Sequence, residues 1–203
     1  MPFKKLHPAI QEKLTEIDFT TPTPFQRKSI PVIKSGANVF CTGAKDCGKT
    51  TTLILTTLQK LKYKSEGDVP RAIILVENKE RALALEEAFA SFMSYNQLRV
   101  YAGYDQLHID VQKSEIFIGV DILISTPKSL NKLFLANGVG TSQLMILSVD
   151  DAEFLSQKSS YEALMAVSQN IKKCQYVMYS EKMSPKLKRL ENFFMEYAKV
   201  VNG

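Results

Sequence analysis

The sequence predicts an α/β fold in which a mostly parallel central sheet of about seven strands carries helices on both faces. Short apolar runs alternate with helical patterns along the chain, as a parallel sheet with crossover helices requires. A glycine-containing turn follows the first run and opens a helix. With 203 residues, 45% of them hydrophobic and 23% charged, the chain can bury one sizeable core. We therefore expect a single globular domain over residues 1–203.

The predicted elements follow from local patterns in the chain. Short apolar runs bounded by turn residues are typical of buried strands, and they occur at Asn38–Thr42, Ala72–Val76, Leu98–Tyr101, Asp121–Ser125, Met145–Val149, Gln175–Tyr179 and Lys199–Val201. Helical patterns occur at Pro8–Ile17, Phe25–Lys34, Thr50–Leu61, Lys79–Tyr95, Tyr104–Ser114, Lys128–Leu135, Ser159–Asn170 and Pro185–Tyr197. The clearest amphipathic stripe belongs to Lys79–Tyr95, where it comprises Ala82, Leu85, Ala88, Phe89 and Phe92.

The segment from Gly43 to Thr50 has the sequence of a phosphate-binding P-loop between a strand and a helix. Backbone N–H groups of such a loop, together with the positive end of the helix, surround phosphates. We expect Lys49 to reach the β- and γ-phosphates and the Thr50 hydroxyl to hold Mg²⁺. The other loop residues predicted to bind the nucleotide are Gly43, Ala44, Lys45, Asp46, Cys47, Gly48 and Thr51. A glycine turn without a ligand is the alternative.

A second acidic site is predicted where the fifth apolar run ends. That run delivers Asp150 to the carboxyl edge of the sheet, where ligands bind in open α/β folds. A carboxylate there can hold Mg²⁺ together with Thr50, and Asp151 can orient or deprotonate an attacking water. The predicted catalytic residues are therefore Lys49, Asp150 and Asp151. The alternative is that the two aspartates only cap a helix that begins near Ala152.

The net charge and the cysteine content bear on the cellular compartment and on the kinds of partner that we expect. The net charge is +5, and the segment Ile171–Gly203 contributes much of the basic excess. This excess permits a nucleic-acid partner without requiring one. The three cysteines lack metal-ligand spacing, no run approaches the roughly 18 apolar residues of a membrane span, and the start lacks the apolar stretch of a signal peptide. We expect a cytoplasmic monomer with reduced thiols, no membrane association, and surface positions for His7 and His108.

The segment Asp150-Asp151-Ala152-Glu153 resembles the DEAD box of the DEAD-box RNA helicases, with the second and fourth carboxylates exchanged in length. The resemblance extends over the chain. Thr23–Gln26 is similar to the family's Q motif, and Gly43–Thr50 is similar to its motif I. Val76–Ala82 is similar to the Pro-Thr-Arg-Glu-Leu-Ala motif, Gly103 to a glycine pair, Ser125–Leu130 to the Thr-Pro-Gly-Arg motif and Tyr179–Lys182 to the Ser-Ala-Thr motif. It implies a RecA-like P-loop NTPase fold, the first of the family's two such domains. The second domain has no counterpart in this sequence.

The resemblance also implies roles for particular residues. Gln26 is expected to hydrogen-bond the adenine edge, and Phe3 to stack on the ring. The implied RNA contacts are Lys79, Gly103, Thr126, Pro127 and Lys128. Coupling between domains is implied for Glu153, Ser180 and Lys182. The implied cofactors are ATP and Mg²⁺, and the implied partners are RNA, as single strands or duplex ends, and a second RecA-like domain.

Several departures from the family pattern predict weak hydrolysis. Asp46 replaces a glycine and Lys45 a threonine of motif I, so a carboxylate lies close to the expected phosphates. Asp151 is one methylene shorter than the family's glutamate, which leaves its oxygens roughly 1–1.5 Å short of the water and can cost on the order of 10²-fold in rate. Lys79 stands where the family has arginine, and it keeps the positive charge but not the planar, forked guanidinium group. A Glu153–Lys182 ion pair is hypothesised to replace the family's link between the DEAD box and Ser-Ala-Thr.

Two functions from different classes remain open. The first is an ATP-driven RNA helicase, of which this chain is the ATP-binding domain. The second is a catalytically impaired relative that keeps the fold and acts as an RNA-binding or protein-interaction module. A P-loop nucleotide kinase fits less well, because it does not explain Gln26, Thr126 and Ser180 in family order.

Overall fold

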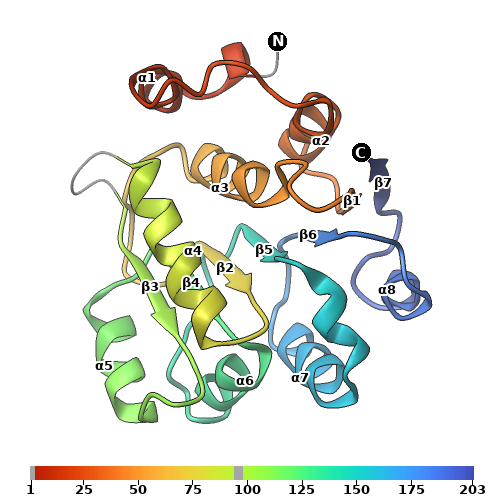
Figure 1. Ribbon diagram of the computed structural model, residues 1–203. Helices are drawn as coiled ribbons and strands as arrows, with labels where there is room; N and C mark the ends of the chain where they lie inside the picture. Colours follow the sequence, from red (N-terminus) through yellow and green to blue (C-terminus); the bar gives the residue numbers. More distant parts are fainter. Residues whose placement is uncertain (1–2, 94–97) are drawn as a thin grey trace.

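The computed structural model describes residues 3–93 and 98–203 and contains a seven-stranded parallel sheet (Figure 1). The strand order is β3-β4-β2-β5-β6-β1-β7. The strands are β1 (Val39–Thr42), β2 (Ala72–Leu75), β3 (Val100–Gly103), β4 (Ile122–Ser125), β5 (Ile146–Val149), β6 (Gln175–Ser180) and β7 (Lys199–Asn202). The predicted fold class is confirmed.

Helices connect the strands. They are α1 (Pro8–Glu16), α2 (Pro24–Lys34), α3 (Lys49–Lys60), α4 (Lys79–Ser91), α5 (Ile109–Ile118), α6 (Pro127–Leu135), α7 (Lys158–Gln169) and α8 (Pro185–Arg189), with 3-10 helices η1 (Phe3–Lys5), η2 (Ala152–Ser156) and η3 (Leu190–Asn192). Four of the helices begin with proline after a side chain that accepts a backbone N–H, namely His7, Thr23, Thr126 and Ser184. Within the described residues, no helix is both long and apolar enough to span a membrane.

Alternate residues of the strands other than β7 pack into two separate cores, one on each face of the sheet. In β1, Val39 and Cys41 pack on the face covered by α1 to α4, whereas Phe40 packs on the opposite face. The opposite face is covered by α5 to α8; in Figure 1, α1 to α3 lie above the sheet, and α6 and α7 lie below it. This burial on both faces explains why the strands are continuous apolar runs. The loops that follow the strands lie at the carboxyl edge of the sheet.

Helices α4, α5 and α8 differ from their predicted bounds by several residues, and α5 ends at Ile118 rather than Ser114. Helix α4 ends at Ser91, and its predicted end at Tyr95 lies outside the described residues. Helix α5 begins at Ile109 rather than Tyr104, because the His108 ring accepts the N–H of Asp110 as a cap. Helix α8 stops at Arg189, since the chain must turn to bury Leu190 and Met195 in the second core. The predicted surface histidines His7 and His108 therefore both serve as helix caps.

Candidate nucleotide site and candidate RNA-binding edge

The phosphate loop joins β1 to α3 at the carboxyl edge of the sheet. Gly43 N donates to the Ser180 carbonyl at 3.0 Å, so the loop leaves the sheet next to the end of β6. Gly48 caps α3 with φ +99°, a conformation that favours glycine. Asp46 also has a positive φ, +60°, where the family pattern has glycine. The loop thus keeps its bend, with a strained non-glycine residue at one position.

Lys49 is folded back onto its own loop. Its Nζ donates to the carbonyls of Gly43 at 2.8 Å and Ala44 at 2.9 Å, and the residue is buried. This places the ammonium group beside the N-terminal turn of α3, where the N–H groups and helix dipole favour anions. A phosphate oxygen can replace the carbonyls as the acceptor.

Asp150 and Thr50 meet although 100 positions separate them. The Thr50 hydroxyl donates to Asp150 Oδ1 at 3.5 Å, and Asp150 N donates to the Leu75 carbonyl at 2.9 Å as an extension of the β5–β2 ladder. Burial raises the pKa of the Asp150 carboxyl, while Arg81, the Thr50 hydroxyl and Lys49 act to lower it. The predicted pair of metal ligands is therefore brought together beside Lys49.

Asp151 is paired with Arg81, a residue that the sequence did not single out. The two side chains form an ion pair, and Asp151 has φ +46° and makes no side-chain cap to η2. The simple capping alternative for Asp151 is thus not observed. Arg81 stands where the family's Pro-Thr-Arg-Glu-Leu-Ala has leucine, and this replacement was the available sequence signal.

A polar cavity of about 510 Å³ lies at this edge, and the buried Asp150 is not among its lining residues. It is lined by Lys45, Asp46, Gly48, Lys49, Thr50, Thr51, Arg81, Asp151 and Glu181. Most of the predicted nucleotide-binding residues are therefore together, and Arg81 and Glu181 are additions. Three basic and three acidic side chains share the lining, so the cavity has no large net charge without a ligand. Among the described residues, no three His, Cys, Asp or Glu side chains are grouped to hold a metal ion by themselves.

Comparison with known proteins agrees with this geometry. A family model described as DEAD/DEAH box helicase matches residues 23–190. The chain belongs to this family. It is 26% identical over 188 residues to the ATP-dependent RNA helicase DeaD of Mycobacterium tuberculosis, covering 92% of this chain and 33% of that protein. It is 28% identical over 151 residues to the human probable ATP-dependent RNA helicase DDX43, covering 72% of this chain and 23% of that protein.

Solved structures show the same fold. A DEAD box protein from Methanococcus jannaschii superimposes with a TM-score of 0.89 at 18% identity, covering 98% of this chain and 54% of that one. Yeast dbp5, solved with nup159, gle1, IP6 and ADP, superimposes with a TM-score of 0.85 at 18% identity over 98% of this chain and 52% of that one. The chain spans at most a third of the curated relatives named above. It has the RecA-like fold of a DEAD-box helicase domain.

The Q-motif residues lie against the P-loop but are buried. Gln26 is 0% exposed, and its Oε1 accepts the Thr23 N–H at 2.9 Å in a capping box. A Cβ on Gly48 would lie 2.8 Å from Gln26 Nε2, which has no hydrogen-bond partner among the residues that the structure describes. The Phe3 ring packs on Phe19 with centroids 5.8 Å apart and is 6% exposed. Base stacking by Phe3 is thus not supported in this conformation, because its ring faces the core.

The DEAD-like box is linked to the Ser-Ala-Thr-like segment by a different contact from the hypothesised one. Glu153 Oε1 accepts the backbone N–H of Glu181 at 2.5 Å, and the Glu153–Lys182 ion pair is not formed. Helix η2 places Glu153 beside the end of β6, where the first N–H beyond the strand needs an acceptor. Ser180 is buried, whereas Lys182 is exposed.

The predicted RNA contacts follow β2, β3 and β4, on the other half of the same edge. The Thr126 hydroxyl caps α6 and donates to Asp105 Oδ2 at 2.8 Å, and Lys132 approaches the same carboxylate at 3.4 Å. Lys79 Nζ lies 5.2 Å from the centroid of the Tyr104 ring. Gly103 ends β3, Pro127 is buried and Lys128 is exposed. Sequence reasoning did not find Asp105, which places an acid at this edge.

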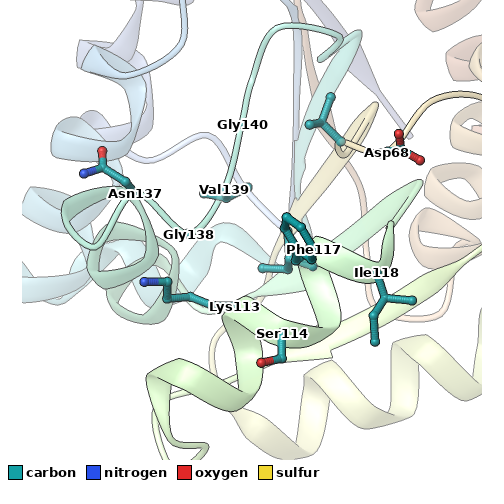
Figure 2. Close-up of a pocket in the computed structure, with 11 residues that line it drawn as sticks. Asp68, Lys113, Ser114, Phe117, Ile118, Asn137, Gly138, Val139 and Gly140 are labelled. Carbon is teal, nitrogen blue, oxygen red and sulfur yellow. The ribbon is translucent and has the colours of Figure 1, made fainter.

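A second cavity, larger than the one at the P-loop, lies elsewhere and contains none of the predicted site residues. It has a volume of about 730 Å³ and lies between the end of α5, the loop after α6 and Asp68 (Figure 2). Phe117 beside it is 90% exposed and Ile118 is 72% exposed. The cavity is largely apolar and offers no cluster of groups for phosphate or metal chemistry.

Proposed function

We propose that residues 1–203 form the ATP-binding domain of an ATP-dependent RNA helicase. In this proposal the P-loop cavity binds Mg-ATP, and the edge formed by β3 and β4 binds single-stranded RNA. The observation that carries it is the meeting of Thr50 and Asp150 at 3.5 Å beside Lys49. A hydroxyl and one carboxylate suit Mg²⁺, which completes its shell with phosphate oxygens and water. Family membership and the relatives' names support the same conclusion.

Each side chain has a distinct part in this proposal. Lys49 exchanges the Gly43 and Ala44 carbonyls for phosphate oxygens, and the first N–H groups of α3 receive the rest of the phosphate charge. Thr50 and Asp150 would hold Mg²⁺, which would neutralise negative charge on the nucleotide phosphates. Asp151 orients a water and accepts its proton. The Asp151 side chain is shorter than the family's glutamate, and its carboxylate is ion-paired with Arg81. We therefore expect hydrolysis by this chain alone to be weak.

Titration of ATP and ADP into this chain, with and without Mg²⁺, tests the proposal by calorimetry. We expect binding that Mg²⁺ strengthens, and at least a tenfold loss in Lys49→Ala, because the charged donor to the phosphates is removed. Lys172→Ala is the matched control, since Lys172 is exposed and far from the loop in sequence. If the parent binds no nucleotide, or Lys49→Ala binds as well as the parent, the nucleotide site is refuted.

Base selection tests the Q motif separately. Gln26 Nε2 is a buried donor without a partner in the described part of the chain, and a base acceptor can satisfy it. We expect ATP to bind more tightly than GTP, and Gln26→Ala to weaken ATP binding more than GTP binding. Equal affinities for the two nucleotides in the parent would rule out adenine selection by Gln26.

An RNA-binding or protein-interaction module without ATPase activity is the second candidate. The observations that favour it are the positive φ of Asp46 and the ion pair that occupies Asp151. This candidate predicts RNA binding unchanged by ATP, ADP or Mg²⁺. The helicase candidate predicts that Mg-ATP changes RNA affinity once a second RecA-like domain is joined to the chain.

A further inference from the structure

Arg81 is a basic residue of the cavity at a position where the family pattern has leucine. It lies in the first turn of α4, where the Asn78 side chain accepts the Arg81 N–H at 3.0 Å. The next residue, Ala82, is fully buried, so the backbone of this turn is fixed. The Arg81 side chain as a whole is about half exposed, and its guanidinium group contacts Asp151 at the cavity. Only the side chain is free to change partner.

The direction of Arg81 differs from that of its neighbour Lys79. Lys79 lies over the Tyr104 ring, beside the edge of β3 and β4 that we propose binds RNA, whereas Arg81 contacts Asp151 in the nucleotide cavity. The strand order explains the second contact, because β2 leads into α4 and its neighbour β5 leads to Asp151. Arg81 therefore lies across the cavity from the P-loop, on the side of the expected attacking water.

When ATP binds, the charge balance of the cavity favours a contact between Arg81 and the phosphates. A triphosphate would add several negative charges to a cavity already lined by Asp46, Asp151 and Glu181. Lys45 and Lys49 alone would face more negative charge than they can offset. A guanidinium fork binds carboxylate and phosphate with the same geometry, so it can move from one to the other without losing hydrogen bonds.

We propose that Arg81 is a phosphate-binding residue that contacts the terminal phosphate of ATP and exchanges Asp151 for it. This rests on the proposed nucleotide site. Without nucleotide, Arg81 neutralises Asp151. With ATP, the guanidinium moves to the γ-phosphate and leaves the Asp151 carboxylate free to meet a water. ADP lacks that phosphate, so the Arg81–Asp151 pair persists and the site distinguishes the two nucleotides.

Affinities of Mg-ATP and Mg-ADP measured by calorimetry on the 203-residue chain test this proposal. Arg81→Leu restores the family's residue and keeps an apolar stem. We expect it to weaken Mg-ATP at least tenfold while Mg-ADP changes less than about threefold, since a charged contact is lost only with ATP. Arg81→Lys should lie between the two. Arg189→Leu, at an exposed site on α8, is the matched control and should change neither affinity.

A second variant tests the exchange of partners. Asp151→Asn removes the competing carboxylate, so we expect Mg-ATP to bind several-fold more tightly with little change for ADP. Equal losses for ATP and ADP in Arg81→Leu, or no loss, overturn the proposal while leaving the nucleotide site intact. Failure of the parent to bind either nucleotide overturns both. If Arg81→Leu does not fold, Arg81→Lys and Asp151→Asn still decide the question.

Discussion

Asp121 and Arg71 form a buried ion pair, with Oδ1 3.0 Å from Nη2, at the amino ends of β4 and β2. The same carboxylate accepts hydrogen bonds from Arg99, Ser65 and the Glu66 N–H, and Asp121 is 0% exposed. Burial acts to raise the pKa of Asp121, but the hydrogen bonds from Arg99, Ser65 and Arg71 outweigh it and hold the pKa at about 2. This cluster joins three adjacent strands and the loop after α3.

The first prediction concerns this cluster. Because the folded pKa of Asp121 is depressed, its contribution to stability is present above its ordinary pKa and is lost as pH falls toward 2. We expect Asp121→Asn to lower the free energy of unfolding at pH 7 by about 3–5 kcal/mol, since two arginines lose their buried partner. Urea unfolding at pH 7 and pH 3 measures the difference, which should shrink at pH 3. Asp110→Asn, at a mostly exposed carboxylate, is the control.

The second prediction is that the proposed magnesium ligand destabilises the nucleotide-free fold. Burial raises the pKa of Asp150, so the stability associated with its protonation is present below its ordinary pKa and is lost as pH rises through the folded value. We expect Asp150→Asn to raise the melting temperature at pH 7 and to remove the effect of Mg²⁺ on ATP binding. Melting curves at pH 7 and near pH 4 check this, and a lower melting temperature at pH 7 would contradict it.

The third prediction separates charge from backbone strain at Asp46, which has φ +60°. Asp46→Asn removes the charge and tolerates this conformation, whereas Asp46→Gly removes the charge and the strain. We expect both variants to bind Mg-ATP several-fold more tightly than the parent, because a carboxylate lining the cavity repels phosphates. A larger gain in the glycine variant would assign part of the effect to the backbone. Weaker binding in both would show that Asp46 is adapted to this site.

The fourth prediction orders the three thiols by reactivity. Cys41 is fully buried and burial raises its pKa, while burial raises the pKa of Cys174 to about 11. Cys47 is partly exposed within the phosphate loop, near the positive end of α3. We expect an alkylating reagent at pH 8 to label Cys47 first, Cys174 next and Cys41 last, as read by mass spectrometry of peptides. Mg-ATP should slow labelling of Cys47 only; equal labelling of Cys47 and Cys41 would argue against an open loop.

The fifth prediction concerns Asp105, at the edge formed by β3 and β4 that we propose binds RNA. Asp105 accepts from the Thr126 hydroxyl and lies near Lys132, so it occupies donors that an RNA phosphate could use. We expect Asp105→Asn to bind a single-stranded oligouridine several-fold more tightly at low salt, measured by fluorescence anisotropy. Asp110→Asn removes a nearby exposed charge and should have a smaller effect. Equal gains in the two variants would mean that only net charge matters.

Much of the site follows from the sequence because its parts are local. The P-loop pattern is contiguous, so Lys49 and Thr50 could be placed on the first turn of a helix from spacing alone. The apolar run before Asp150 identified a strand, and in a parallel sheet the carboxyl ends of strands share one edge. The meeting of Thr50 with Asp150 was therefore predictable, and the seven strands were predicted for the same reason.

Contacts between side chains of distant elements could be decided only by the tertiary structure. Side-chain directions at the ends of β2 and β5 decide whether Asp150 or Asp151 contacts Arg81. Side-chain directions at the end of β6 decide whether Glu153 contacts Lys182 or accepts a backbone N–H. Burial of Phe3 and the early end of α8 were likewise set by packing, because long-range apolar contacts override local helix preference. The sequence determined the fold and the order of its motifs. Three-dimensional packing determined which charges face one another.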